Sequence, residues 1–203
     1  MLRPRRFRLV ALLLAAAVDG PPAARGAPPA PPDPAADERL LDVFAQRVDE
    51  YVKLQGVLSR EAGGPLPKDA TPEQIEAFIV RLRPKIQAAR AHARPGDLLV
   101  RELQPVFRRI LRAELTGPAA AHAREAVLKE GNPRAETPAA AVEVKVNGVY
   151  SIAAPVSTVP PNVLRRLPPL PEQVLEYRFV GRDMILRDVA ADLIVDYMKE
   201  AVP

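Results

Sequence analysis

The chain has 203 residues, of which 48% are hydrophobic, 24 are proline and none is cysteine, a length that suits one domain or one domain with a tail. Without cysteine, disulfide bonds, thiolate catalysis and a lipid-modified N-terminal cysteine are excluded. The formal net charge of +4 becomes 0 when residues 1–26, with their five arginines and one aspartate, are removed, so charge gives no whole-protein argument for nucleic-acid binding.

Residues 1–26 have the layout of an export signal. A group of arginines precedes an apolar run of ten residues, Leu9–Val18, which is too short to span a bilayer core of about 30 Å. Small residues follow, so cleavage is predicted between Ala17 and about Ala27; an uncleaved anchor or a buried helix is the alternative. Residues 27–36 are rich in alanine and proline and are predicted to be a disordered leader. We therefore expect a periplasmic or secreted protein with no transmembrane segment in its mature chain.

Residues 37–130 carry the periodicity of three or four helices. Apolar residues recur at intervals of three and four after Asp37, which we take as an N-cap, and predict a helix over 37–60. A second helix begins at Thr71, where T-P-E-Q forms a capping box, and Pro84 is predicted to kink it or end it early. A third helix is predicted over about 101–115, with Pro105 either in its middle or in its first turn. A short alanine-rich helix is predicted over about 119–130.

The pattern changes after residue 140. VEVKV at 142–146 alternates with period two and predicts a strand. PPNVLRRLPPLPE at 160–172 predicts one turn of helix followed by polyproline-like chain. The segment LPPLPEQ would suit a polyproline ligand, but its place between two folded pieces favours a docked connector.

Residues 176–198, EYRFVGRDMILRDVAADLIVDYM, are predicted to form a three-stranded meander. Gly181-Arg182 is placed in a two-residue type II′ turn. This turn gives the pairs Val180 with Asp183, Phe179 with Met184, Tyr177 with Leu186 and Glu176 with Arg187. A four-residue turn at 189–192 gives the second set, Leu186 with Val195 and Met184 with Tyr197. One face is then wholly apolar, and a shift by one residue would destroy it; its members are Tyr177, Phe179, Met184, Leu186, Leu193, Val195 and Tyr197.

The charged residues of this meander allow two interpretations. On the second face, Glu176 is predicted to pair with Arg187, and Arg178 with Asp196, each pair adding about 0.2–1 kcal/mol. The alternative is an acidic cluster that binds a divalent cation, made of Asp183, Asp188, Asp192 and Asp196. These aspartates lack the every-second-residue spacing and the turn glycine of a calcium loop. We therefore favour sheet pairing and assign no metal ligand.

No arrangement of residues typical of an enzyme is found. His92 and His122 lie in surface rich in alanine and arginine, without an i+4 carboxylate or histidine, so we predict both to be exposed. The sequence holds no G-x-S-x-G, no phosphate-binding glycine loop and no H-E-x-x-H. We assign no catalytic residue and no cofactor, although a pair of carboxylates acting in a hydrolase is not excluded by the sequence.

Basic residues are concentrated between Arg81 and Arg112. This stretch holds nine lysines and arginines against only Asp97 and Glu102. On two neighbouring helices, five of them would form a basic face, namely Arg81, Lys85, Arg108, Arg109 and Arg112. Such a face would suit an anionic partner, a lipid headgroup or a cell-wall polymer. A solvated helix surface without a partner is the simpler interpretation.

Together these elements predict an α+β protein. Residues 37–203 are expected to form a single domain, with a helical part at 37–130 and a strand part at 142–203. The helices are predicted to pack as a small antiparallel bundle that the meander covers with its apolar face, and the strand at 142–146 would extend the sheet to four strands. Because a three-stranded meander alone is marginal, we expect both parts to share one core.

Seven segments distributed over the chain after the leader resemble a family of exported bacterial proteins of unknown function. They are VDEYVKLQ, ARPGDLL, FRRIL, LKEGNP, VNGVY, VPPNVLRRLPPLPE and LEYRFVGRDMILRDVAADLIVDYM. This resemblance implies no particular activity. YRFVGRDMILRDVAADLIVDYM is also loosely similar to the terminal strand–turn–strand–turn–strand module of the periplasmic nickel/cobalt-homeostasis regulator family, which implies a folding pattern and not a metal site. Ala191 and Asp192 stand where that module has Thr-Gly.

Two functions from different classes follow. The preferred one is a non-catalytic exported protein that binds a protein partner or an envelope component, because the sequence specifies a fold clearly but contains no catalytic motif. The alternative is a periplasmic divalent-metal or small-ligand sensor, suggested by the acidic turns at Asp188 and Asp192 and by the looser resemblance. A hydrolase without a recognisable motif comes third. Nucleic acid is not an expected partner, and the sequence leaves the oligomeric state open.

Overall fold

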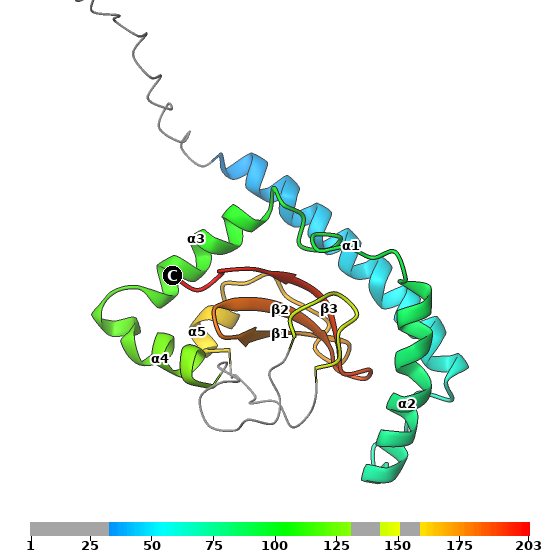
Figure 1. Ribbon diagram of the computed structural model, residues 1–203. Helices are drawn as coiled ribbons and strands as arrows, with labels where there is room; N and C mark the ends of the chain where they lie inside the picture. The colour runs from blue at the N-terminus through cyan, green and yellow to red at the C-terminus, as the bar shows by residue number, and fades with distance from the viewer. Residues whose placement is uncertain (1–32, 131–142, 151–158) are drawn as a thin grey trace, which may run out of the picture. The chain divides into compact units, whose positions relative to one another are not determined.

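The computed structural model describes residues 33–130, 143–150 and 159–203 (Figure 1). The predicted export signal at 1–26, most of the predicted leader and the first residue of the predicted strand at 142–146 lie outside these ranges. Residues 33–203 form one compact unit, and every described core residue lies between Phe44 and Val202. No helix within the described ranges is both long enough and apolar enough to cross a membrane.

The first helix, α1, spans Pro34–Glu61 and begins earlier than predicted. Asp33 is its N-cap and accepts a hydrogen bond from the backbone N–H of Ala35 at 3.1 Å, so the expectation that Asp37 caps the helix, and that the leader extends to residue 36, is wrong. The physical reason is Pro34: its fixed φ and missing N–H suit the first helical position. The chain leaves the helix through Gly63, whose φ of +92° lies in the left-handed region.

The second helix, α2, spans Pro72–Ala89 and starts with the predicted capping box. Gln74 N–H donates to the Thr71 hydroxyl at 3.4 Å, and the Gln74 side chain accepts from Thr71 N–H at 2.8 Å. The helix does not end early at Pro84 but continues for five residues. Pro84 and Val80 are both exposed, so the carbonyl that loses its helical partner at this position can bind water instead.

The remaining helices are short. α3 spans Gln104–Leu115 and has Pro105 in its first turn, the second of the two placements considered above. A 3₁₀ turn, η1 at Pro118–Ala120, leads into α4 at Ala121–Glu130, and α5 is the single turn Pro161–Leu164. The chain after α5 is a docked connector, as predicted: Leu167 is buried, and the Tyr177 hydroxyl donates to the carbonyl of Pro168 at 3.0 Å.

Three antiparallel strands follow in the order β1-β2-β3, with bounds Leu175–Val180, Asp183–Asp188 and Leu193–Met198. The predicted register between β1 and β2 is confirmed at every pair, from Glu176 with Arg187 to Val180 with Asp183. Gly181 has φ of +58° at the first turn position, and the following arginine has no positive φ, as a type II′ turn requires. The four-residue turn at 189–192 is also confirmed.

The register between β2 and β3 matches the prediction next to the turn, at Asp188 and Arg187, and differs from it by one residue from Leu186 to Met184. Leu186 lies opposite Asp196 rather than Val195, and Met184 lies opposite Met198 rather than Tyr197, because a β-bulge interrupts the ladder after Leu186. Met198 therefore takes the core position expected for Tyr197, which lies on the other face with Tyr150, Ile185 and Ile194. The expected pair between Arg178 and Asp196 is absent for the same reason.

The predicted strand at 142–146 is wrong for its described residues, 143–146, which are not in a strand. Pairing occurs slightly later: Asn147 N–H donates to the carbonyl of Ile194, Ile194 N–H to that of Gly148, and Tyr150 N–H to that of Asp192, each at 2.8 Å. Val149 forms an isolated bridge with Leu193. Residues 147–150 thus run along the outer edge of β3 without forming a fourth strand.

One core joins the helices to the sheet, and the protein is α+β as predicted. Phe107 of α3 contacts Phe44 of α1 and Tyr177 of β1, with ring centroids 5.5 and 6.1 Å apart. Figure 1 shows α1 above the sheet, α3 and α4 on its left and α2 on its right. A second cluster packs α2 against the turn between β2 and β3 through Phe78, Leu82, Ile86, Ala191 and Leu193.

Candidate functional site

The four aspartates of the meander do not form one site. Asp183 accepts from Lys199 Nζ at 2.7 Å and from Glu200 N–H at 3.0 Å, at the end of the hairpin. The other three are buried, and each has its own partners on a different element. Within the described ranges, no group of three His, Cys, Asp or Glu side chains could hold a metal ion.

Asp188 connects β2 to α1. Its carboxylate accepts from the Tyr51 hydroxyl at 2.6 Å and from the backbone N–H of Ala191 at 2.7 Å. Burial raises the pKa of Asp188, although these hydrogen bonds act in the opposite direction. Burial and the neighbouring Asp188 charge raise the pKa of Tyr51 well above its ordinary value, so the phenol stays protonated and donates. This pair positions the helix on the sheet.

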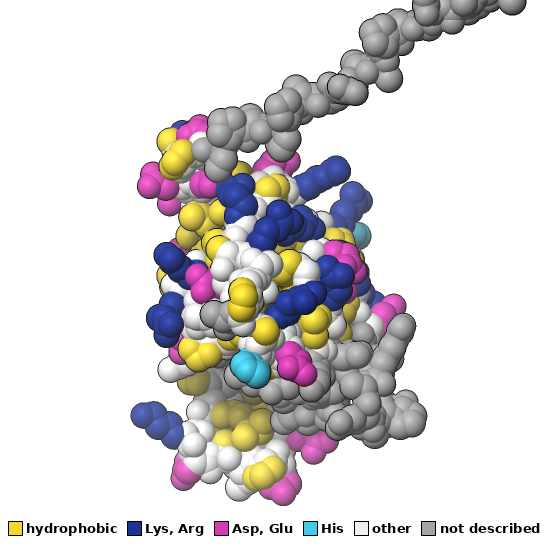
Figure 2. Space-filling view, turned by 90° about the vertical axis from the view of Figure 1, so that its left-hand side faces the viewer, with side chains coloured by type: hydrophobic (Ala, Val, Ile, Leu, Met, Phe, Trp, Pro, Cys, Tyr) yellow, Lys and Arg dark blue, Asp and Glu magenta, His cyan; other side chains and the backbone are white. Residues whose placement is uncertain are grey.

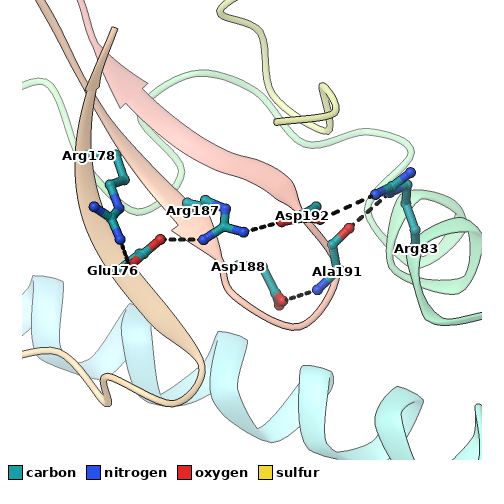
Figure 3. A network of polar contacts seen from close by, with 7 residues as sticks. All are labelled: Arg83, Glu176, Arg178, Arg187, Asp188, Ala191 and Asp192. Carbon is teal, nitrogen blue, oxygen red and sulfur yellow. Dashed lines mark hydrogen bonds and ion pairs between the residues drawn. The ribbon is translucent and has the colours of Figure 1, made fainter. Parts of the chain in front are cut away.

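Asp192 belongs to a chain of ion pairs on the opposite face of the sheet (Figure 3). Glu176 pairs with Arg187 as predicted and also with Arg178 at 2.7 Å, and Arg187 reaches on to Asp192. Arg83 of α2 lies 3.9 Å from Asp192 and donates to the carbonyl of Ala191 at 2.9 Å. Burial alone would raise the pKa of Glu176, but the hydrogen bonds from both arginines outweigh it and hold that pKa below its ordinary value.

Asp192 is also the last residue of the turn between β2 and β3. Its φ is +51°, in the left-handed region that glycine occupies most easily and that aspartate tolerates better than most residues. The side chain that glycine would lack is used here for the ion pair with Arg187. Asp192 therefore links β2 to the end of the turn.

Asp196 anchors the loop that precedes α3. One carboxylate oxygen accepts from the backbone N–H of Gly96 at 2.9 Å and of Tyr197 at 2.8 Å. The other accepts from the N–H groups of Leu98 and Leu99, both at 2.8 Å. All of these partners are structural, so the buried acids of the meander stabilise the fold and leave no carboxylate among them directed at solvent.

The two histidines are exposed, as predicted. The predicted basic face is not formed as one surface, because its members are distributed over two helices that pack in different clusters. On α2, Arg81 donates to the carbonyl of Ala62 at 2.8 Å and Lys85 pairs with Glu61 at 3.3 Å. On α3, Arg108 donates to the carbonyl of Lys199 at 2.9 Å. Arg109 and Arg112 of α3 remain exposed.

Two further arginines, which the sequence analysis did not include, join this part of α3. Arg165 and Arg166 directly follow α5, and α5 packs against α3. Glu114 of α3 holds the two elements together, because it accepts from the Asn162 side chain at 2.9 Å and pairs with Arg166 at 3.3 Å. We call this set the arginine surface, and its members are Arg109, Arg112, Arg165 and Arg166.

The arginine surface has an apolar floor. Arg109, Glu114 and Arg166 line a shallow depression of about 310 Å³ together with the partly buried Ile110 and the exposed Ala113. Figure 2 views the side of the molecule that carries α3 and α4, and shows dark-blue basic side chains concentrated in its upper half with hydrophobic side chains among them. Two carboxylates contact the surface: Asp37 pairs with Arg109, and Glu114 with Arg166. Four arginines thus outnumber their acidic partners by two.

A second depression lies at the C-terminal end of α3. It measures about 340 Å³ and is lined by Leu115, Thr116, Gly117, Ala121, Arg124 and Pro203. Arg124 is held by the carbonyl of Pro203 at 2.9 Å, so this depression offers no comparable group of free charges. The arginine surface is therefore the stronger candidate site.

Comparison with known proteins adds no independent evidence about either depression. No protein-family model, no curated protein and no solved structure matches this chain. The resemblances to an exported family and to the nickel/cobalt-homeostasis module thus stay predictions from short motifs. The candidate site rests on its own geometry: α3 and the end of α5 bring Arg109 and Arg166 together around an apolar floor. Arg112 follows Arg109 by three residues on α3, and Arg165 directly precedes Arg166.

Proposed function

We propose that this protein is a non-catalytic binding module of the cell envelope, and that the arginine surface holds an anionic partner. The observation that carries this proposal is that two arginines of this surface have no acidic side chain to pair with among the described residues. Among the described residues, neither Arg112 nor Arg165 has an ion-pair partner, and both are exposed. Guanidinium groups bind phosphate and carboxylate through paired hydrogen bonds, so a group of them favours an anion over a neutral ligand.

The other charged clusters support a structural role rather than a second site. Arg187 pairs with both Glu176 and Asp192. Asp188 attaches α1, and Asp196 attaches the loop before α3. An enzyme would need reactive groups that are accessible, and the acids of the meander with perturbed pKa values, Glu176, Asp188 and Asp196, are committed to these contacts. The arginine surface is solvent-facing, which suits recognition of a macromolecular or surface partner.

A soluble polyanion tests the proposal. The chain 27–203, which contains every described core residue, would be titrated into labelled inorganic polyphosphate and followed by fluorescence anisotropy. Arg112→Gln combined with Arg165→Gln removes two positive charges that have no ion-pair partner among the described residues. Lys53→Gln combined with Lys68→Gln is the matched control, because both lysines are exposed on other parts of the chain.

We expect the arginine double variant to bind polyphosphate more weakly than the wild type and the lysine double variant to bind as the wild type does. Binding that falls equally in both variants would mean that only net charge matters, and would contradict a specific surface. Absence of any binding at low salt would contradict the proposal altogether, because electrostatic contacts are strongest there.

A further inference from the structure

We infer that the anionic partner is the headgroup layer of a lipid bilayer, against which the arginine surface lies with Leu164 entering the interface. This inference rests on the proposed function and adds the class of partner. The observation that supports a membrane is a large apolar side chain next to the arginines in the chain. Leu164, the last residue of α5, is 46% exposed and directly precedes Arg165 and Arg166.

Leu164 is held outward by its neighbours in the chain. Val163 and Leu167 are 0% and 5% exposed and fix both sides of the turn in the main core. The side chain of Asn162 ties the same turn to Glu114 of α3. Because α5 is attached at these points, Leu164 cannot turn inward without breaking the packing of its neighbours. A leucine fixed in this way presents apolar area permanently to whatever the surface meets.

The combination of positive charge and apolar area favours a bilayer over a soluble polymer as the partner. A polyanionic polymer can satisfy the arginines but offers nothing apolar to Leu164. At a bilayer surface, phosphate groups lie next to acyl chains, so arginines bind the headgroups while a neighbouring leucine enters the boundary. Ile110 and Ala113 between the arginines extend the apolar area in the same place. The chain after predicted cleavage has no net charge, so attraction to a membrane must come from a local surface such as this one.

The test uses sedimentation of the chain 27–203 with vesicles of equal parts phosphatidylglycerol and phosphatidylcholine, and with vesicles of phosphatidylcholine alone. Near an anionic bilayer, each arginine contributes about a fivefold change in affinity, so Arg112→Gln combined with Arg165→Gln is expected to weaken binding by about 25-fold. Leu164→Ser is expected to weaken it by about fivefold, because about half of a leucine side chain would be withdrawn from the interface. Val57→Ser is the matched control: Val57 is 45% exposed and lies on α1, outside the arginine surface.

Binding to the anionic vesicles that both the arginine double variant and Leu164→Ser reduce, with Val57→Ser unchanged, would support the inference. Polyphosphate binding that Leu164→Ser leaves intact would show that the leucine acts on lipid and not on folding. Binding to polyphosphate but not to vesicles, or vesicle binding that does not depend on Leu164, would overturn the membrane inference and leave the proposed function standing. Binding to neither probe would overturn both.

Discussion

Replacing Asp196 by asparagine is the sharpest test of how the meander is joined to the helices. Each carboxylate oxygen of Asp196 accepts two backbone N–H groups, from Gly96 and Tyr197 on one side and from Leu98 and Leu99 on the other. Asparagine keeps the shape but turns one oxygen into an NH₂ group, which cannot accept. Two backbone donors in a buried site would then lose their partner.

The expected loss follows from the number of donors. A buried donor without a partner costs about 1–3 kcal/mol, so Asp196→Asn is expected to lower the free energy of unfolding by about 2–6 kcal/mol. The free energy of unfolding of a typical domain is about 5–15 kcal/mol, so this loss is a large part of it. Asp196→Asn is therefore expected to be partly unfolded at room temperature if the wild type lies at the low end of that range. Urea unfolding of the chain 27–203, followed by circular dichroism, measures the change directly.

Asp49→Asn serves as the control, because Asp49 is exposed on α1. It is expected to change the free energy of unfolding by less than about 0.5 kcal/mol. If Asp196→Asn were as stable as this control, the carboxylate would not anchor the loop before α3, and the reasoning from its hydrogen bonds would be refuted.

Three further predictions concern the remaining acids. Glu176→Gln is expected to lower the free energy of unfolding by about 1–3 kcal/mol at neutral pH. Because the folded-state pKa of Glu176 is lowered, its contribution is complete above the unfolded pKa of about 4.3 and is lost as pH falls through the folded value. Urea titrations of both proteins should therefore converge in acid, and a gap independent of pH would argue against the ion pairs. Tyr51→Phe removes the hydroxyl that Asp188 accepts from and should cost about 1–3 kcal/mol in the same assay, whereas no loss would show that the contact is dispensable. Nickel, cobalt and calcium are expected to leave the melting temperature unchanged, since every aspartate of the meander is already partnered; a rise of several degrees with any of them would restore the sensor alternative.

Much of the fold follows from local patterns. The β1–β2 register was predictable because Gly181 marks the turn and the apolar residues alternate on both sides of it. The start of α2 was predictable because the capping box lies within four residues. The β2–β3 register was not, because it includes a bulge beside Asp196, whose carboxylate binds a loop about a hundred residues earlier in the chain. Nothing in the local pattern of β3 indicates where that carboxylate finds its donors.

The candidate site was predictable only in part. The arginines of α3 stood out as a run of basic residues, but their grouping with α2 assumed that consecutive helices are neighbours. The connection of α3 to α5 depends on Glu114 meeting Asn162 and Arg166 about fifty residues later. The L-R-R in the proline-rich connector was the available signal, since it places two adjacent arginines beside the predicted turn of helix.

The hydrogen bond between Tyr51 and Asp188 has a consequence for the order of folding. Its two residues are 137 positions apart, and the core residues of α1 and α3 find their partners on strands that are synthesised after both helices. Such long-range closure slows folding, and the apolar faces of the helices stay open until the meander arrives. The meander itself closes through turns of two and four residues and can form quickly. We therefore expect the meander to form first and the helices α1 and α3 to pack against it afterwards.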